Sequence, residues 1–262
     1  MQIPDELLKY PELSDWCILC AYRGSMAHGM YIPGTDPNSI DDIDLMAVCV
    51  PPIDYYIGLP SFGSRDTKEI KYNEWDIVVY EAIKFIRLLS KGNPNVLSLL
   101  WVEPENYITM KYPGEILIAH RDAFSCRHVY HSFTGYAYGQ LQRMTHYVFE
   151  GYMGSKRKAL VDKFGYDCKN ASHLIRLLRM SIEFLGTGEL IVKRPDASEL
   201  LEIKHGEWEL EKVKEEAGKL FKLAEEAYNK STLPERPDAD YVNKVCVEVI
   251  REALHLHWRT KQ

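Results

Sequence analysis

Two aspartates, Asp42 and Asp44, alternate with apolar residues at the start of the segment 42–50. In a β-strand both carboxylates would point the same way, while Ile43 and Leu45 would point into the core. Neighbouring carboxylates repel each other unless a positive charge lies between them. Because Mg²⁺ prefers oxygen ligands, the spacing predicts that this pair binds Mg²⁺, with Mn²⁺ as a substitute. Taken alone, the pattern is also typical of an ordinary acidic strand entrance.

Gly24 and Ser25 follow an apolar run at residues 16–22, and the residues after them favour a helix. A strand, a glycine and a helix N-terminus together expose free backbone N–H groups and the positive end of a dipole. Gly24 would let the backbone approach a phosphate closely, and Ser25 would add a hydroxyl donor. Gly-Ser occurs in many turns. Together with the paired aspartates, however, it predicts a seat for phosphates that a metal bridges.

The hydrophobic pattern predicts the elements that position these residues. Strands are expected at 16–22, 42–50, 67–72 and 75–80, the last two joined by a turn at Asn73 and Glu74. Helices are expected at 81–90, after Pro94, and at 126–153, 155–164, 170–186, 207–230 and 238–258. Residues 53–66 resemble a loop, and 189–194 a short strand.

This order of elements predicts an α+β fold, in which a small mixed β-sheet core with helices is followed by a mostly helical C-terminal part. The expected domains are residues 1–115 and 116–262, with the boundary between about 105 and 120.

The composition limits the class of protein. The chain has 262 residues, 46% of them hydrophobic, which is enough for a large core. It contains no apolar run of about 18 residues and no signal-peptide pattern, so we expect no membrane contact and a cytoplasmic location. Cys17 and Cys20 form a CxxC inside an apolar run, which favours buried thiols over a zinc or redox site. The net charge of −6 argues against wrapping a long duplex.

Several sequence blocks carry a resemblance to a known family. They are RGSMAHGMYIPGTDPNSIDDIDLMAVCVPP, YYIGL, VVYEAIKFIRLLSKGNPNVLSLLW and GYDCKNASHLIRLLRM, spread between about residue 16 and residue 205. They resemble the DNA polymerase beta superfamily of nucleotidyltransferases, in the branch associated with RNA-repair genes. Residues 34–39 look like an insertion, since the stretch between Ser25 and Asp42 is longer than in many members. The resemblance implies metal-dependent transfer of a nucleoside monophosphate from an NTP to a hydroxyl, with release of pyrophosphate.

The superfamily uses a third carboxylate from a neighbouring strand, and the resemblance points to Asp76. This residue lies between two apolar residues in EWDIVVYE, as the other two aspartates do. Its expected role is to accept the proton of the attacking hydroxyl while it contacts the metal. Asp66, Glu69 and Glu81 are the alternatives, and a strand-end aspartate in a turn is the plain structural interpretation.

Basic residues on the expected helix 170–186 are candidates for phosphate binding. The resemblance suggests that this helix faces the cleft, where Lys169, His173 and Arg176 would neutralise the triphosphate or an RNA phosphate. A solvated basic face is an equally good interpretation. Arg23, directly before the glycine bend, is a further phosphate candidate. The run at 156–158 either guides an acceptor strand or is an exposed surface run.

The acceptor is the least defined part of the expected reaction. An RNA 3′ end, such as that of a tRNA, leads because of the family's genomic association; a small molecule such as an aminoglycoside, or a protein side chain, is the alternative. A non-catalytic nucleotide-binding module, like some antitoxins, is the rival class. Aromatic residues at helical spacing are expected mainly in the core, although one of them could stack on a base: Tyr130, Phe133, Tyr136, Tyr138 and Tyr147.

Overall fold

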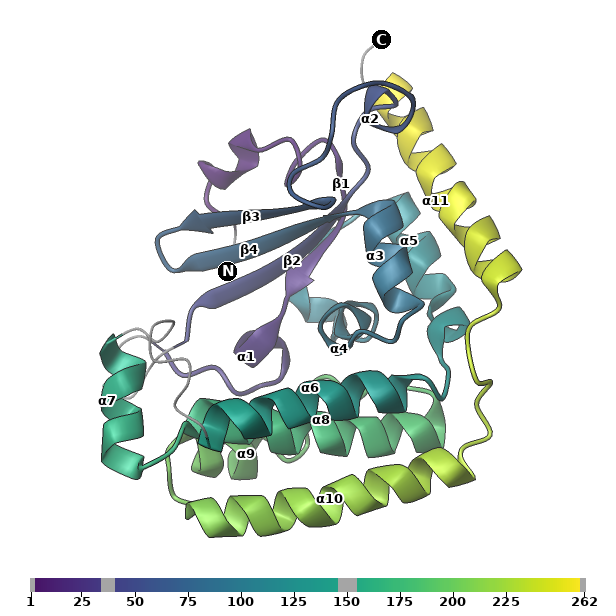
Figure 1. The fold of residues 1–262 in the computed structure, drawn as a ribbon. Helices are drawn as coiled ribbons and strands as arrows, with labels where there is room; N and C mark the ends of the chain where they lie inside the picture. Colours follow the sequence, from purple (N-terminus) through teal and green to yellow (C-terminus); the bar gives the residue numbers. More distant parts are fainter. Residues whose placement is uncertain (1–2, 34–40, 146–154, 260–262) are drawn as a thin grey trace.

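The computed structural model describes residues 3–33, 41–145 and 155–259 (Figure 1). The expected insertion at 34–39, Tyr147 and the end of the expected helix 126–153 lie outside these residues. Five strands form one sheet in the order β3-β4-β2-β1-β5. The strands are β1 (Cys17–Tyr22), β2 (Ile43–Cys49), β3 (Thr67–Tyr72), β4 (Trp75–Glu81) and β5 (Tyr107–Met110). Only β2 and β4 pair in parallel, so the sheet is mixed, as predicted.

The alternation of side chains divides the sheet into two buried faces. Leu45 on β2 and Ile77 on β4 belong to a core formed with the N-terminal segment. Met46 and Val78, one residue further along, belong to a larger core that includes the helices. Because both faces are covered, the two central strands are almost continuously apolar after their first residues. Asn73, at φ 50°, supplies the left-handed backbone in the turn between β3 and β4.

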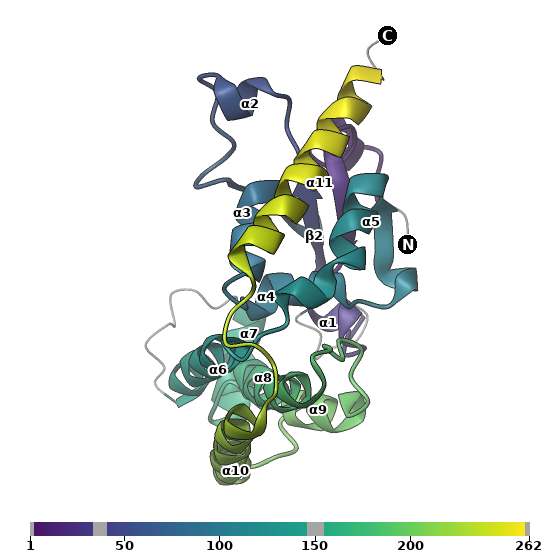
Figure 2. The same ribbon diagram turned by 90° about the vertical axis from the view of Figure 1, so that its right-hand side faces the viewer.

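The helices lie against one face of the sheet and below its edge (Figure 1). Those nearest the sheet are α1 (Gly24–Ala27), α2 (Asp54–Ile57), α3 (Ala82–Leu89), α4 (Pro94–Leu97) and α5 (Tyr112–Ala119). A separate layer contains α6 (Val129–Thr145), α7 (Ser155–Phe164), α8 (Cys168–Thr187), α9 (Ala197–Lys204) and α10 (Leu210–Lys230). The last helix, α11 (Ala239–Arg259), returns to pack on α5 and α3 (Figure 2). The α+β class is therefore confirmed.

A few local predictions were wrong. Residues 189–194 form no strand, and the expected loop 53–66 contains the single turn α2. Strand β5 and helices α5 and α9 were not predicted. No helix within the described residues is long and apolar enough to span a bilayer. The division of the chain at residues 115 and 116 stays a prediction.

Candidate active site

Two of the three candidate carboxylates lie side by side on the sheet. In the parallel pairing of β2 and β4, Asp44 is the direct partner of Asp76. Their flanking residues are buried on the opposite face, so both carboxylates point toward the helices, and each side chain is 28% exposed. Neighbouring strands lie about 4.8 Å apart, which sets the spacing of the pair. Asp42 is exposed, one residue before β2 begins.

The charges around Asp44 oppose each other. Burial raises the pKa of Asp44 above its ordinary value, and the negative charges of Asp76 and Asp42 raise it further. The nearby cations Arg23 and Lys169 act in the opposite direction. The three candidate carboxylates therefore repel one another, and their common environment favours added positive charge.

The glycine bend packs directly against this carboxylate pair. Gly24 has φ +60°, and a Cβ atom added to it would lie 2.5 Å from Asp44 Oδ2. Next to it, the Arg23 backbone N–H donates to the Asp44 carbonyl oxygen at 2.9 Å, and Arg23 Nη2 lies 3.3 Å from Asp44 Oδ1. The turn of helix α1 begins at Gly24 itself and includes the half-buried Ser25. The order strand, Gly-Ser and helix is therefore present, and the phosphate role of Ser25 stays a prediction.

The donor set is chemically suited to a hard cation but is not gathered around one. All three candidate ligands are carboxylates, which Mg²⁺ accepts, and the Gly24 backbone lies so close to Asp44 that a Cβ there would meet the carboxylate at 2.5 Å. Within the described part of the chain, however, no group of three or more His, Cys, Asp or Glu side chains is arranged to hold a metal. Asp44 instead faces Arg23, and Asp76 lies 3.5 Å from Lys71 Nζ. The metal stays a prediction, in which a cation would replace these ion pairs.

The alternatives for the third carboxylate lie elsewhere. Glu81 caps helix α3 by accepting two backbone N–H bonds, at 2.9 and 3.0 Å. The Asp66 carbonyl oxygen accepts from the Glu81 backbone N–H, which places Asp66 at the same far end of β4. Glu69 is exposed on β3, at the outer edge of the sheet. Asp76 is thus the acid that stands beside Asp44.

Helix α8 brings a basic face toward the same site. Lys169 Nζ lies 3.5 Å from Asp41 Oδ1, next to the carboxylates. His173, one turn further on, has a pKa well below its ordinary value, because it is desolvated and because Arg176 and Lys169 are nearby. His28, at the end of α1, shows the same direction of pKa shift, with burial as the first cause and Arg176 as the second. Both histidines are therefore neutral in a strongly positive environment.

Arg176 lacks a carboxylate partner among the described residues. Its Nη1 donates to the sulfur of Met180 at 3.2 Å, and within the described ranges its buried Nε has no hydrogen-bond partner. Burial, and then the charge of Arg194, lower the pKa of Arg176 to about 10. An unpaired, desolvated guanidinium of this kind would bind an anion strongly.

One buried ion pair at the site was not foreseen from the sequence. The Asp41 side chain is 1% exposed and that of Lys204 is 4% exposed. Lys204 Nζ, from helix α9, donates to Asp41 Oδ2 and, at 3.2 Å, to the Met30 carbonyl oxygen. Asp41 Oδ2 also accepts from the Ile32 backbone N–H at 3.0 Å. This pair fastens α9 to the segment that leads into β2.

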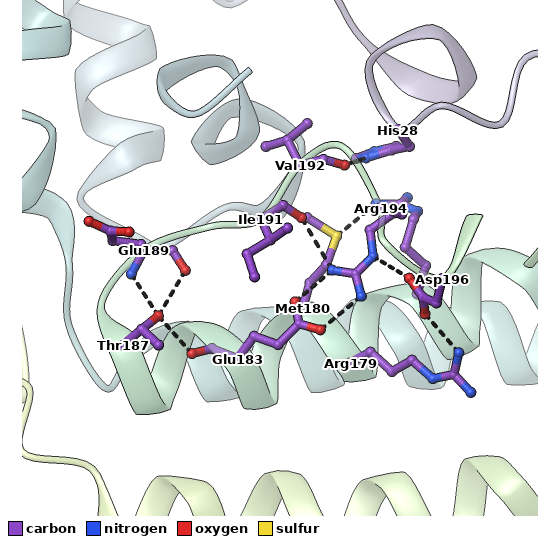
Figure 3. A network of polar contacts seen from close by, with 11 residues as sticks. His28, Arg179, Met180, Glu183, Thr187, Glu189, Ile191, Val192, Arg194 and Asp196 are labelled. Atoms are coloured by element: carbon purple, nitrogen blue, oxygen red, sulfur yellow. Dashed lines mark hydrogen bonds and ion pairs between the residues drawn. The ribbon is translucent and has the colours of Figure 1, made fainter. Parts of the chain in front are cut away.

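A second network connects the end of α1 to α8 (Figure 3). The Arg194 side chain is 1% exposed and donates to both oxygens of Glu183, at 2.6 and 2.8 Å, and to Asp196 at 2.8 Å. The Arg194 backbone N–H donates to the His28 carbonyl oxygen at 3.2 Å, and His28 Nδ1 lies 2.8 Å from the Val192 carbonyl oxygen. The network therefore holds the glycine-serine turn at a fixed position over α8.

A comparison with family models identifies a family for this chain. The family model described as the RNA repair pathway DNA polymerase beta family matches residues 16–248. A solved structure, a nucleotidyltransferase-like protein from Exiguobacterium sibiricum 255-15, is similar with 14% identity and a TM-score of 0.29, covering 95% of this chain and 78% of that chain. No curated protein matches the chain at a significant level.

Proposed function

The chain belongs to the RNA repair pathway DNA polymerase beta family, and we propose that it transfers a nucleoside monophosphate from an NTP to a hydroxyl acceptor. The observation that carries this proposal is the packing of Gly24 against Asp44, with Asp76 in register beside it. A bend that could approach phosphates closely would then lie beside a pair of mutually repelling carboxylates.

In the proposed reaction, each group of residues has a defined task. Asp44, Asp76 and Asp42 would hold Mg²⁺ or Mn²⁺, which supplies charge neutralisation at the α-phosphate when bound. Ser25 would donate its hydroxyl to a phosphate, with Gly24 permitting close contact. The carboxylate of Asp76 would accept the proton as the acceptor oxygen attacks the α-phosphorus. The bond from the α-phosphorus to the bridging oxygen breaks, and pyrophosphate leaves with the electron pair.

The basic face of α8 would bind the charge of the leaving group. Lys169 and Arg176 carry positive charge, and Arg176 has no carboxylate partner among the described residues. Arg23, now paired with Asp44, would be free to contact a phosphate once a cation takes its place. Because the pKa of His173 is lowered, this residue would contact a phosphate through a neutral N–H donor rather than through a charge.

We propose an RNA 3′ end, such as that of a tRNA, as the acceptor, because the family is associated with RNA repair. The net charge of −6 favours contact with a short end over a long duplex. A small molecule or a protein hydroxyl is the alternative. In the non-catalytic alternative the chain only binds nucleotide, but the placement of repelling carboxylates side by side at Asp44 and Asp76 favours turnover.

A panel of α-labelled NTPs with Mg²⁺ and total RNA tests the proposal. We expect the label to enter RNA with one preferred NTP, and Asp42→Asn and Asp44→Asn to lower incorporation at least about 100-fold. Asp122→Asn, at an exposed aspartate outside the site, is the matched control. Equal incorporation by the wild type and the two site variants would refute the mechanism. Tight NTP binding without pyrophosphate release would support the non-catalytic alternative.

A further inference from the structure

One further surface of the molecule is aromatic and partly exposed. We define it by Tyr80 on β4, Asn93 in the turn between α3 and α4, and Tyr136 on α6, and call it the aromatic ledge. Tyr136 is 39% exposed, and its hydroxyl accepts a hydrogen bond from Asn93 Nδ2 at 2.9 Å. Asn93 is itself fixed, because its Oδ1 caps α4 by accepting from the Asn95 backbone N–H at 3.0 Å. The Tyr136 ring is therefore anchored at its tip while much of it is accessible.

The aromatic ledge lies on the same face of the sheet as the carboxylates. Asp76, Val78 and Tyr80 alternate onto the helix side of β4, and Tyr80 is four residues from Asp76. At about 3.3 Å per residue, the two positions are roughly 13 Å apart. Burial raises the pKa of Tyr80, and the charges of Arg23 and Tyr136 also act on its hydroxyl, the first lowering and the second raising this pKa. Tyr80 and Asp76 thus lie on one face of one strand.

The order of the strands determines which substrate would pass the aromatic ledge. Asp44 lies on β2, between Gly24 on the β1 side and Asp76 on the β4 side. In an in-line displacement the acceptor approaches opposite to the leaving pyrophosphate. If the phosphates occupy the Gly24 side, the acceptor enters from the β4 side, where the ledge begins.

The surface of α6 beside Tyr136 is open to a polymer. Gly135 and Gly139 are interior helix residues, and a Cβ added to either would meet no described residue within 4 Å. Core packing therefore does not require these glycines, although glycine disfavours a helix. Gly139 lies one turn from Tyr136 on the same stripe, so a backbone could approach the helix closely next to the ring.

We propose that the aromatic ledge stacks the unpaired base near the 3′ end of a single-stranded RNA acceptor, with Tyr136 as the stacking residue. This inference rests on the proposed function, because the direction of approach follows from the transfer reaction. Base stacking on an aromatic side chain tolerates any base, so the aromatic ledge would position the 3′ end of the RNA without selecting its sequence. Among the other expected aromatic candidates, Phe133 is buried, and the Tyr130 ring stacks on Tyr228.

Binding of an RNA oligonucleotide with 2-aminopurine as its 3′-terminal base, measured by fluorescence without NTP, tests the stacking directly. We expect quenching with the wild type and with Tyr136→Phe, which keeps the ring. Tyr136→Leu should remove the quenching and raise the Kd about 10-fold, equivalent to roughly 1.4 kcal/mol. Tyr138→Leu is the matched control, because Tyr138 is 57% exposed on the same helix but two residues away, on another side.

Each result either supports or overturns the inference. An RNA that is not bound, or is bound without quenching, overturns the aromatic ledge as an acceptor site. A Tyr136→Leu variant that raises the KM for NTP but not for RNA also overturns it, since the ledge would then hold the incoming base. A wild type that quenches the RNA probe but releases no pyrophosphate with any NTP supports the inference and refutes the proposed function.

Discussion

Replacing Gly24 with alanine tests whether the close packing of the glycine bend against Asp44 is needed for activity. At φ +60° an alanine pays about 1–2 kcal/mol for a left-handed conformation. Its Cβ would lie 2.5 Å from Asp44 Oδ2, whereas ordinary contact begins at 3.4 Å, so the carboxylate must retreat by about 0.9 Å. That movement is cheap for stability, because a side-chain end moves. A displacement of about 1 Å at a reacting group nevertheless costs on the order of 100-fold in rate.

Gly29→Ala is the matched control for this variant. Gly29 has φ +70°, but a Cβ added there meets only Lys193 Cγ, at 4.0 Å. We therefore expect both variants to lose about 1–2 kcal/mol in urea unfolding, and only Gly24→Ala to lose about 100-fold in pyrophosphate release. If Gly24→Ala keeps full activity, or if Gly29→Ala loses as much, the contact between the bend and Asp44 is not catalytically important.

Two further predictions concern the charges of the site. Because its pKa is raised in the folded state, Asp44 holds a proton more tightly there than in the unfolded chain. The stability that results is fully present below the unfolded pKa of about 4 and is lost as the pH rises through the folded pKa. Asp44→Asn should therefore unfold at a higher temperature than the wild type at pH 7 without metal, by a margin that shrinks toward pH 4; a lower Tm at pH 7 would contradict this. Lys204→Met leaves the buried Asp41 charge without its main partner and should cost about 3–5 kcal/mol in urea unfolding. Lys219→Met, at an exposed ion pair, should leave the free energy of urea unfolding unchanged. Equal losses in the two lysine variants would refute this role of burial.

The sequence was sufficient for those parts of the site that arise from local pattern. Alternation within DIDLMAVCV and EWDIVVYE predicted β2 and β4, and the superfamily resemblance added that Asp76 comes from a strand next to that of Asp44. The glycine bend could also be predicted from the sequence, because a strand, Gly24 and a short helix follow one another in the chain. These features depend on residues only a few positions apart, where alternation and turn chemistry determine the structure.

The remaining parts depend on pairings between distant segments. Asp41 and Lys204 are separated by 163 residues, and a lysine at the end of α9 looks like any solvated helix residue until its partner is known. Arg194 lies in a segment that was expected to be a strand, so its buried network with Glu183 could not be foreseen. Helical spacing likewise did not distinguish Tyr136 from its aromatic neighbours, since its contact with Asn93 joins residues 43 positions apart. No local pattern encodes such contacts.

The return of α11 to the sheet has a consequence for synthesis on the ribosome. This helix begins at Ala239, yet its buried Val245 and Val249 pack into the core that α3 and α5 share with the sheet. The nascent strands and their adjoining helices therefore emerge with an apolar face that stays open until α11 has followed. We expect this interval to make the growing chain prone to association and dependent on chaperones, and its folding to be completed only after α11 has been synthesised.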